Sequence, residues 1–247
     1  MEAKKRWFEE WFDSPYYHLL YNSRDEKEAA SFIDKLLHYL HPPAGAVMLD
    51  VACGKGRHAK QLADDGYDVT GIDLSPASIL AARQMETETL HFFQHDMRLP
   101  FRINYYDFAF NFFTSFGYFD TDLNNENALH NMMLALKPGG KLVLDYLNSS
   151  YTREHLVPCE QRQIGSVHFD IERVYQDRRF LKQIRITDAA KNVQQTFTES
   201  VRAYTLEDFK GMFARHRLQM EEVFGDYLFN RYDERMSPRL ILIAKKS

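Results

Sequence analysis

The stretch that decides the fold is Val47–Ser75, VMLDVACGKGRHAKQLADDGYDVTGIDLS. It begins in a short apolar run, residues 46–49, of the kind that forms a strand buried on both faces of a parallel sheet. A glycine-rich turn follows, and residues 57–65 then have the pattern of a helix that ends at Gly66. A second apolar run comes next. The order of strand, turn, helix and strand predicts a βαβ unit of a parallel sheet.

The ends of the two predicted strands carry groups suited to a nucleoside. Gly54 and Gly56 allow the backbone to turn tightly and to approach a ligand that a β-carbon would displace. Asp73 ends the second apolar run, where a carboxylate can accept hydrogen bonds from both hydroxyls of a ribose. The unit therefore predicts a half-site for a nucleoside-containing ligand at the carboxyl ends of parallel strands.

These residues resemble the cofactor site of class I S-adenosylmethionine-dependent methyltransferases. The resemblance rests on residues 50–56, DVACGKG, and on residues 71–76, GIDLSP. It implies that the glycine turn lies along the methionine and ribose parts of S-adenosylmethionine and that Asp73 holds the ribose. It also implies that Asp50 helps to hold the methionine amino group, directly or through water.

The resemblance extends to segments before and after this unit. Tyr17 and Tyr21 match tyrosines of an N-terminal lid, which would meet the methionine end of the cofactor. Asp96 matches the acid that binds the adenine amino group, and the backbone of Met97 would meet a ring nitrogen. Asn111 would lie nearest the methionine part. The complete set of cofactor-binding residues expected is Tyr17, Tyr21, Asp50, Ala52, Gly54, Gly56, Asp73, Leu74, Asp96, Met97 and Asn111.

A nicotinamide or flavin dinucleotide site is the competing interpretation, since Gly54-x-Gly56-x-x-Ala59 fits its loose fingerprint. Asp50 opposes it, because a carboxylate just before the turn repels a pyrophosphate and attracts an amino group. The sequence therefore favours an S-adenosylmethionine-dependent methyltransferase (EC 2.1.1.-). A tRNA or protein methyltransferase, an NAD-dependent oxidoreductase and a non-catalytic cofactor-binding module stay open as alternatives.

The composition of the whole chain limits its partners and compartment. A net charge of −4 over 247 residues gives no general field that attracts nucleic acid or an anionic membrane. Two cysteines, Cys53 and Cys159, form no disulfide framework, which indicates a reducing compartment. No stretch approaches the ~20 apolar residues of a membrane span, and the N-terminus lacks the apolar run of a signal peptide. We expect a cytoplasmic protein with no membrane partner, and the charge does not favour a nucleic-acid partner.

The remaining patterns predict an α/β, Rossmann-like doubly wound fold with helices on both faces of the sheet. Further strands are expected at 90–94, 106–110, 141–147, 218–224 and 240–244, which completes a seven-stranded, mostly parallel sheet. Helices are expected at 25–40, 76–86, 122–136 and from residue 205. The expected domains are an N-terminal helical lid (1–40), the cofactor-binding domain (41–150 and 205–247) and an inserted antiparallel sheet (151–204).

The insertion and the aromatic loop at residues 111–119 are expected to enclose the methyl acceptor. Residues 167–175, 180–187 and 195–204 alternate apolar and polar side chains, as antiparallel strands with one wet face do. A small-molecule acceptor would enter between this sheet, the lid and the loop, and the sheet could also mediate a homodimer. Methyl transfer is an in-line displacement that depends on alignment and on exclusion of water. No catalytic base is assigned, and the ten histidines predict no metal site.

Overall fold

The computed structural model describes residues 6–21 and 26–247. The strands are β1 (Val47–Val51), β2 (Asp68–Asp73), β3 (Leu90–Gln94), β4 (Tyr106–Asn111), β5 (Leu136–Leu147), β6 (Cys159–Ile164), β7 (Val167–Gln176), β8 (Arg179–Asp188), β9 (Val193–Arg202), β10 (Leu218–Phe224) and β11 (Arg239–Lys246). The helices are α1 (Trp7–Trp11), α2 (Pro15–Tyr21), α3 (Glu26–Leu40), α4 (Arg57–Asp64), α5 (Pro76–Ala82), α6 (Asp122–Ala135), α7 (Ser149–Glu154) and α8 (Leu206–Arg215), with a 3-10 turn at Arg83–Met85. Across the described ranges, no helix has the length and apolar character needed to cross a bilayer.

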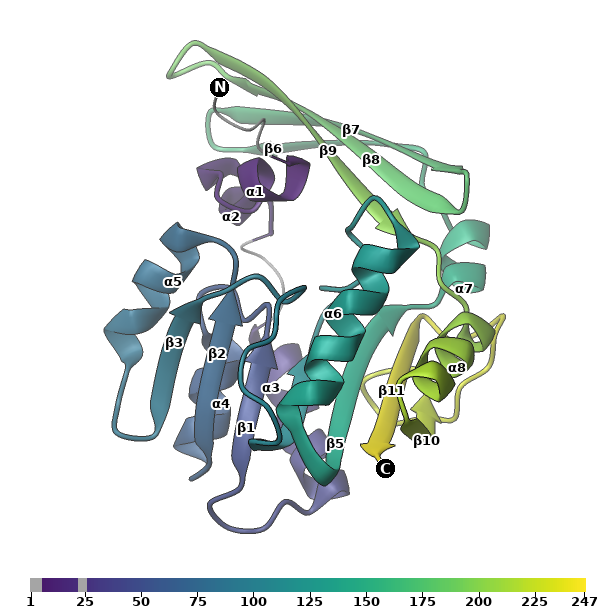
Figure 1. Ribbon diagram of the computed structural model, residues 1–247. Coiled ribbons are helices and arrows are strands. Elements are labelled where there is room, and N and C mark those ends of the chain that lie inside the picture. The colour runs from purple at the N-terminus through teal and green to yellow at the C-terminus, as the bar shows by residue number, and fades with distance from the viewer. Residues whose placement is uncertain (1–5, 22–25) are drawn as a thin grey trace.

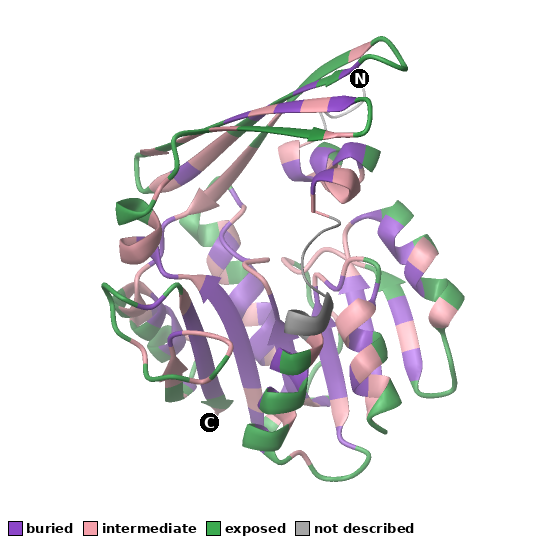
Figure 2. Cartoon of the chain, turned by 180° about the vertical axis from the view of Figure 1, so that it is seen from behind, coloured by how far each residue is buried: buried purple, intermediate pink, exposed green. Residues whose placement is uncertain are grey.

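The core is a seven-stranded sheet in the order β10-β11-β5-β4-β1-β2-β3 (Figure 1). The pairs formed by β1 to β5 are parallel, whereas β11 runs antiparallel to both β5 and β10. Helices α6 and α8 pack on one face, and α3, α4 and α5 pack on the other. Figure 2 shows the central strands as buried, while exposed residues gather on the outer faces of the helices. The predicted Rossmann-like fold is therefore confirmed.

Two elements of the core differ in detail from the sequence prediction. Helix α5 ends at Ala82, and a 3-10 turn carries the helical backbone on to Met85, close to the predicted end near residue 86. Just beyond this turn, the Glu86 side chain accepts a hydrogen bond of 2.8 Å from the Phe92 amide of β3. Strand β5 begins at Leu136 rather than at residue 141. Residues 137–140, Lys-Pro-Gly-Gly, lie inside β5 as an irregularity, where the pairing of β5 with β4 shifts register.

The insertion forms a separate antiparallel sheet of four strands, in the order β6-β7-β8-β9. Strands β7, β8 and β9 agree with the alternation in the sequence. Strand β6 and helix α7 were not predicted. The side chains of Cys159–Ile164 are all exposed or half-buried, so this edge strand leaves no apolar alternation in the sequence.

The N-terminal helices and the inserted sheet pack against each other. Trp11, Tyr16 and Leu20 of the lid share one apolar cluster with Phe169, Ile184 and neighbouring residues of the sheet. The Tyr16 hydroxyl lies 3.2 Å from the Asp188 carboxylate. Figure 1 shows α1 and α2 between this sheet and the carboxyl ends of the core strands. We call this combined structure the cap.

Candidate functional site

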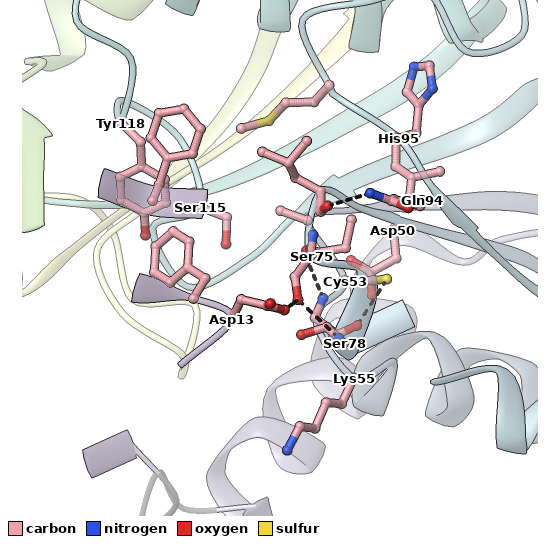
Figure 3. Close-up of a pocket in the computed structure, with 18 of the residues that line it drawn as sticks. Asp13, Asp50, Cys53, Lys55, Ser75, Ser78, Gln94, His95, Ser115 and Tyr118 are labelled. Atoms are coloured by element: carbon pink, nitrogen blue, oxygen red, sulfur yellow. Dashed lines mark hydrogen bonds between the residues drawn. The ribbon is translucent and has the colours of Figure 1, made fainter. Parts of the chain in front are cut away.

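A cavity of about 610 Å³ lies at the carboxyl ends of β1, β2 and β4, beneath the lid helices α1 and α2. Its walls come from the glycine turn, the end of β2, the loop after β3, the aromatic loop and the lid helices. Figure 3 shows Tyr118 and Ser115 on one side of the cavity and Asp50, Ser75 and Gln94 on the other. Nine of the eleven predicted cofactor residues line it: Tyr17, Tyr21, Asp50, Ala52, Gly54, Asp73, Leu74, Asp96 and Met97.

Asp50 is a buried carboxyl group at the cavity wall. It is 1% exposed, and among the described residues its Oδ2 atom has no hydrogen-bond partner. Burial raises the pKa of Asp50 to about 7, and the nearby Asp73 carboxylate adds to the rise. A buried charge without a partner is costly. A ligand that brings a positive charge to this oxygen would remove that cost, whereas a pyrophosphate would increase it.

Asp73 is held rigidly at the end of β2. Its Oδ2 accepts the Gly54 amide at 2.8 Å, and its Oδ1 accepts the Ser75 amide at 2.8 Å. Burial raises the pKa of Asp73, while these two backbone hydrogen bonds oppose the rise. A carboxylate has about four acceptor positions, so lone pairs remain for two ribose hydroxyls.

The two glycines of the turn have different physical roles. Both have left-handed φ angles, 56° at Gly54 and 81° at Gly56. A β-carbon on Gly54 would meet nothing within 4 Å, because this position faces the open cavity. A β-carbon on Gly56 would lie 2.4 Å from the Phe92 ring. Gly56 does not line the cavity. A glycine is needed at this position because α4 packs closely against β3.

Asp96 lies at the cavity edge, but its carboxylate already has a partner. Arg98 donates through Nε to Oδ1 and Oδ2 at 3.0 and 3.1 Å, and its Nη2 makes a further hydrogen bond. Although burial alone raises it, the pKa of Asp96 is lowered by these hydrogen bonds from Arg98. An adenine amino group would therefore share this carboxylate with Arg98. The adenine role of Asp96 stays a prediction.

Asn111 lies behind the cavity wall rather than in it. Its side chain is fully buried, its Nδ2 donates to the Val51 carbonyl at 3.0 Å, and its Oδ1 has no partner in the part of the chain that the structure describes. The following residues Phe112 and Phe113 line the cavity in its place. The aromatic loop was expected to line a cavity, but which of its side chains face inward depends on the path of the backbone after β4.

Tyr17 and Tyr21 lie on α2 and face the cavity from the lid. The Tyr21 hydroxyl donates to Glu199 of β9 at 2.6 Å and accepts a hydrogen bond from Lys182 of β8. The Trp11 indole also donates to Glu199, at 2.7 Å. Tyr21 thus belongs to the junction between lid and sheet as well as to the cavity wall.

Several lining residues were not assigned to the site from the sequence. Asp13 of the lid accepts hydrogen bonds from the Ser75 hydroxyl at 2.7 Å and from the Ala77 amide at 3.3 Å, which ties the lid to the start of α5 (Figure 3). His18 also lines the cavity, and burial followed by the Lys55 charge lowers its pKa. Single polar residues in a lid carry no local pattern that distinguishes them from solvated surface residues.

The comparisons with known proteins agree with this geometry. Residues 48–140 match the family described as a methyltransferase domain. The chain is 30% identical over 145 residues to a putative methyltransferase of a Geobacillus species, a match that covers 57% of this chain and 58% of that protein. It is 34% identical over 133 residues to a Streptomyces venezuelae protein named dTDP-3-amino-3,4,6-trideoxy-alpha-D-glucopyranose N,N-dimethyltransferase, covering 52% of this chain and 54% of the relative.

The fold is also that of a solved methyltransferase. An S-adenosylmethionine-dependent methyltransferase of Clostridium acetobutylicum superposes with a TM-score of 0.78 at 17% identity, covering 94% of this chain and 96% of the other. The sequence matches above span only slightly more than half of those two relatives. Residues 48–140 match a methyltransferase domain, and the resemblance to class I methyltransferases predicted from the glycine turn is confirmed.

Proposed function

We propose that this chain, whose core is a methyltransferase domain, transfers the methyl group of S-adenosylmethionine to a small-molecule acceptor by in-line displacement (EC 2.1.1.-). The observation that carries the proposal is the unpartnered Oδ2 of Asp50, buried at the wall of a cavity. S-adenosylmethionine brings a primary ammonium group that suits this oxygen. A dinucleotide would bring a pyrophosphate, which the same oxygen would repel.

The residues of the cavity fit the rest of this cofactor. Asp73 would hold the ribose hydroxyls. The open space beside Gly54 would accommodate the cofactor, which a side chain at this position would displace. When bound, S-adenosylmethionine supplies a methyl group activated by a sulfonium. The task of the chain is then to align the acceptor and to keep water away, which the rings of Phe12, Phe113 and Tyr118 at the wall favour.

The acceptor is proposed to be a small molecule because lid residues such as Phe12, Tyr17 and Tyr21 line the cavity. The inserted sheet packs on the lid and supplies none of the described lining residues, so its expected part in enclosing the acceptor would be indirect. A cavity of about 610 Å³ suits a cofactor with a small partner. One relative is named for N,N-dimethylation of an amino sugar carried on a nucleotide, which is an acceptor of this kind. A tRNA or protein acceptor would need an open approach to the methyl group and is the second candidate.

The division of the chain follows from the same proposal. Residues 41–150 and 205–247 would form the cofactor-binding domain together with α3, which packs on the core sheet rather than in the expected lid of residues 1–40. Helices α1 and α2 would close over the cofactor, and residues 151–204 would support these helices from outside the cavity. A cytoplasmic location suits a small-molecule enzyme with free cysteines. A homodimer through the inserted sheet would have to use a polar surface, because the outward side chains Asp170, Glu172 and Arg185 pair with one another or with neighbouring glutamines.

Calorimetric titration tests the cofactor directly. Wild-type protein should bind S-adenosylhomocysteine and not NAD. Asp73→Ala should lose this binding, whereas Asp64→Ala, on the exposed side of α4, should keep it. Turnover is then measured as S-adenosylhomocysteine release over a panel of amines, alcohols, thiols and tRNA. Binding without turnover of any acceptor would support a non-catalytic module, and preference for NAD would support an oxidoreductase.

A further inference from the structure

The turn after β4 has a strained backbone. Phe113 and Thr114 are consecutive non-glycine residues with φ angles of 55° and 60°. Side chains other than glycine rarely adopt this left-handed region, and they keep it only where the surrounding structure holds them there. Phe113 lines the cavity, and Ser115 and Tyr118 line it a few residues later. The strained turn therefore sets the direction of the aromatic wall.

One buried residue, Asp145, accepts hydrogen bonds from both strained residues. Asp145 lies at the end of β5 and is fully buried. Its Oδ2 accepts the Phe113 amide at 2.8 Å, and its backbone carbonyl accepts the Thr114 amide at 3.0 Å. One residue thus satisfies two successive amides of the turn, which fixes the backbone path at the point where it is least favourable.

An arginine completes this support from a distant part of the chain. Arg239, at the start of β11, donates to Asp145 Oδ1 through Nε at 2.9 Å and through Nη2 at 2.7 Å. The same Nη2 lies 2.9 Å from the Thr114 hydroxyl. The guanidinium therefore neutralises the buried carboxylate and also contacts the second strained side chain.

The ion pair has a geometry that stability alone does not require. Burying two charges costs desolvation, and an apolar pair of similar size often stabilises a fold equally well. Here the hydrogen bonds point at the turn. Neither Asp145 nor Arg239 lines the cavity, so neither is placed to touch the cofactor or the acceptor.

We propose that Asp145 and Arg239 are positioning residues for methyl transfer. They hold the Phe113–Thr114 turn in its strained conformation, so that Phe113, Ser115 and Tyr118 form the acceptor side of the cavity. This inference rests on the proposed methyltransferase function. The turn also sets the contact with the lid, because the Tyr118 ring centroid lies 5.3 Å from that of Phe12.

The test compares Arg239→Met with a matched control, Arg215→Met. Arg215 forms an exposed ion pair with Glu126, so the control removes an arginine–carboxylate pair remote from the turn. Three quantities are measured: the Kd of S-adenosylhomocysteine, kcat/KM for an acceptor found with the panel above, and amide hydrogen exchange at Phe113 and Thr114. Arg239→Lys is included as the conservative variant.

In Arg239→Met, kcat/KM should fall about 100-fold, the effect of misplacing a reacting group by an ångström. The Kd of S-adenosylhomocysteine should stay within about twofold of the wild-type value, because Arg239 does not line the cavity. Exchange at the two amides should be at least roughly tenfold faster. Arg239→Lys should recover part of kcat/KM, and Arg215→Met should match wild type in all three measurements.

Unchanged kcat/KM in folded Arg239→Met would overturn the inference. A Kd that rises in parallel with the loss of kcat/KM would also overturn it, since the pair would then support the fold as a whole. If Arg239→Met does not fold, Thr114→Val removes only the hydroxyl contact and should lower kcat/KM about threefold to tenfold. If wild type binds no S-adenosylhomocysteine, the proposed function fails, and amide exchange alone decides whether the pair holds the turn.

Discussion

Replacing Asp50 with asparagine tests the electrostatics of the site through stability. Burial raises the pKa of Asp50 from 3.8 to about 7 in the folded protein, with Asp73 as the second cause. In the unfolded chain the carboxyl group keeps its ordinary value. The unfolded state therefore releases this proton first as the pH rises, and the folded, ligand-free protein loses stability between about pH 4 and about pH 7.

The size of this effect follows from the displacement of the pKa. At about 1.4 kcal/mol per pH unit, the cost of ionising Asp50 reaches about 4 kcal/mol above pH 7. Asparagine removes this cost but brings N–H donors that also need partners, so we expect a net gain of about 2–3 kcal/mol at about pH 8. For a chain of this size the gain corresponds to a Tm higher by about 5–10 °C. At about pH 4, where Asp50 is protonated, only the cost of the asparagine donors remains, and Asp50→Asn should melt about 2–5 °C below wild type.

The same substitution should weaken cofactor binding while it stabilises the empty protein. A hydrogen bond between charged groups contributes about 1.5–3 kcal/mol, so Asp50→Asn should raise the Kd of S-adenosylhomocysteine about 10- to 100-fold. In wild type the Kd should rise about tenfold per pH unit below pH 7, because Asp50 must lose its proton to bind an ammonium group. Asp50→Asn should lack this pH dependence.

Calorimetry in buffers of different ionisation enthalpy measures both the Kd and the protons released, and thermal unfolding without ligand measures the stability. The exposed Asp64→Asn serves as the control and should behave as wild type. If Asp50→Asn lowers Tm at about pH 8, or if wild-type affinity is constant between about pH 6 and about pH 7, the reasoning is refuted.

Three further predictions follow from single contacts. Gly56→Ala should lower the free energy of unfolding by about 2–4 kcal/mol, because its β-carbon would lie 2.4 Å from the Phe92 ring. The control Gly45→Ala, whose β-carbon would meet nothing within 4 Å, should cost about 1 kcal/mol. Denaturant unfolding measures both. Burial lowers the pKa of His58 to about 3, so its ring resonances should not titrate above about pH 5; an NMR midpoint near 6.5 would contradict this. Glu199→Ala removes the acceptor of the buried Trp11 indole and of the Tyr21 phenol. It should weaken S-adenosylhomocysteine binding about threefold to tenfold and lower Tm by a few degrees, whereas unchanged affinity would exclude this junction from cofactor retention.

Much of the fold could be predicted from the sequence because its signals are local. Neighbouring residues alone specify the apolar runs of β1 and β2, the glycine turn and the start of α5 after Ser75. They meet at one sheet edge by the ordinary geometry of a βαβ unit. The Gly54 amide and the Asp73 carboxylate meet in this way, 2.8 Å apart. Strand β6 could not be predicted, since its residues are polar and its conformation comes from pairing with β7.

The candidate site could be predicted in part. The local unit supplied Asp50, Gly54 and Asp73, and all three line the cavity. Asn111 was expected beside the cofactor but lies behind the wall, because alternation along β4 and the strained turn after it direct the next residues inward. The path of the surrounding backbone decides whether a loop side chain points into the cavity. Neighbouring residues in the sequence do not specify this path.

The sequence by itself determined a parallel βαβ core with two carboxylates and a bare glycine turn at one edge, since spacing along the chain sets these positions. Only the tertiary structure decided that Glu199 of the inserted sheet holds the lid and that Arg239 meets Asp145 beneath the aromatic loop. Trp11 and Glu199 are 188 residues apart, and Asp145 and Arg239 are 94 apart. No local pattern relates such residues, because their contact depends on how the completed sheet and the cap pack together.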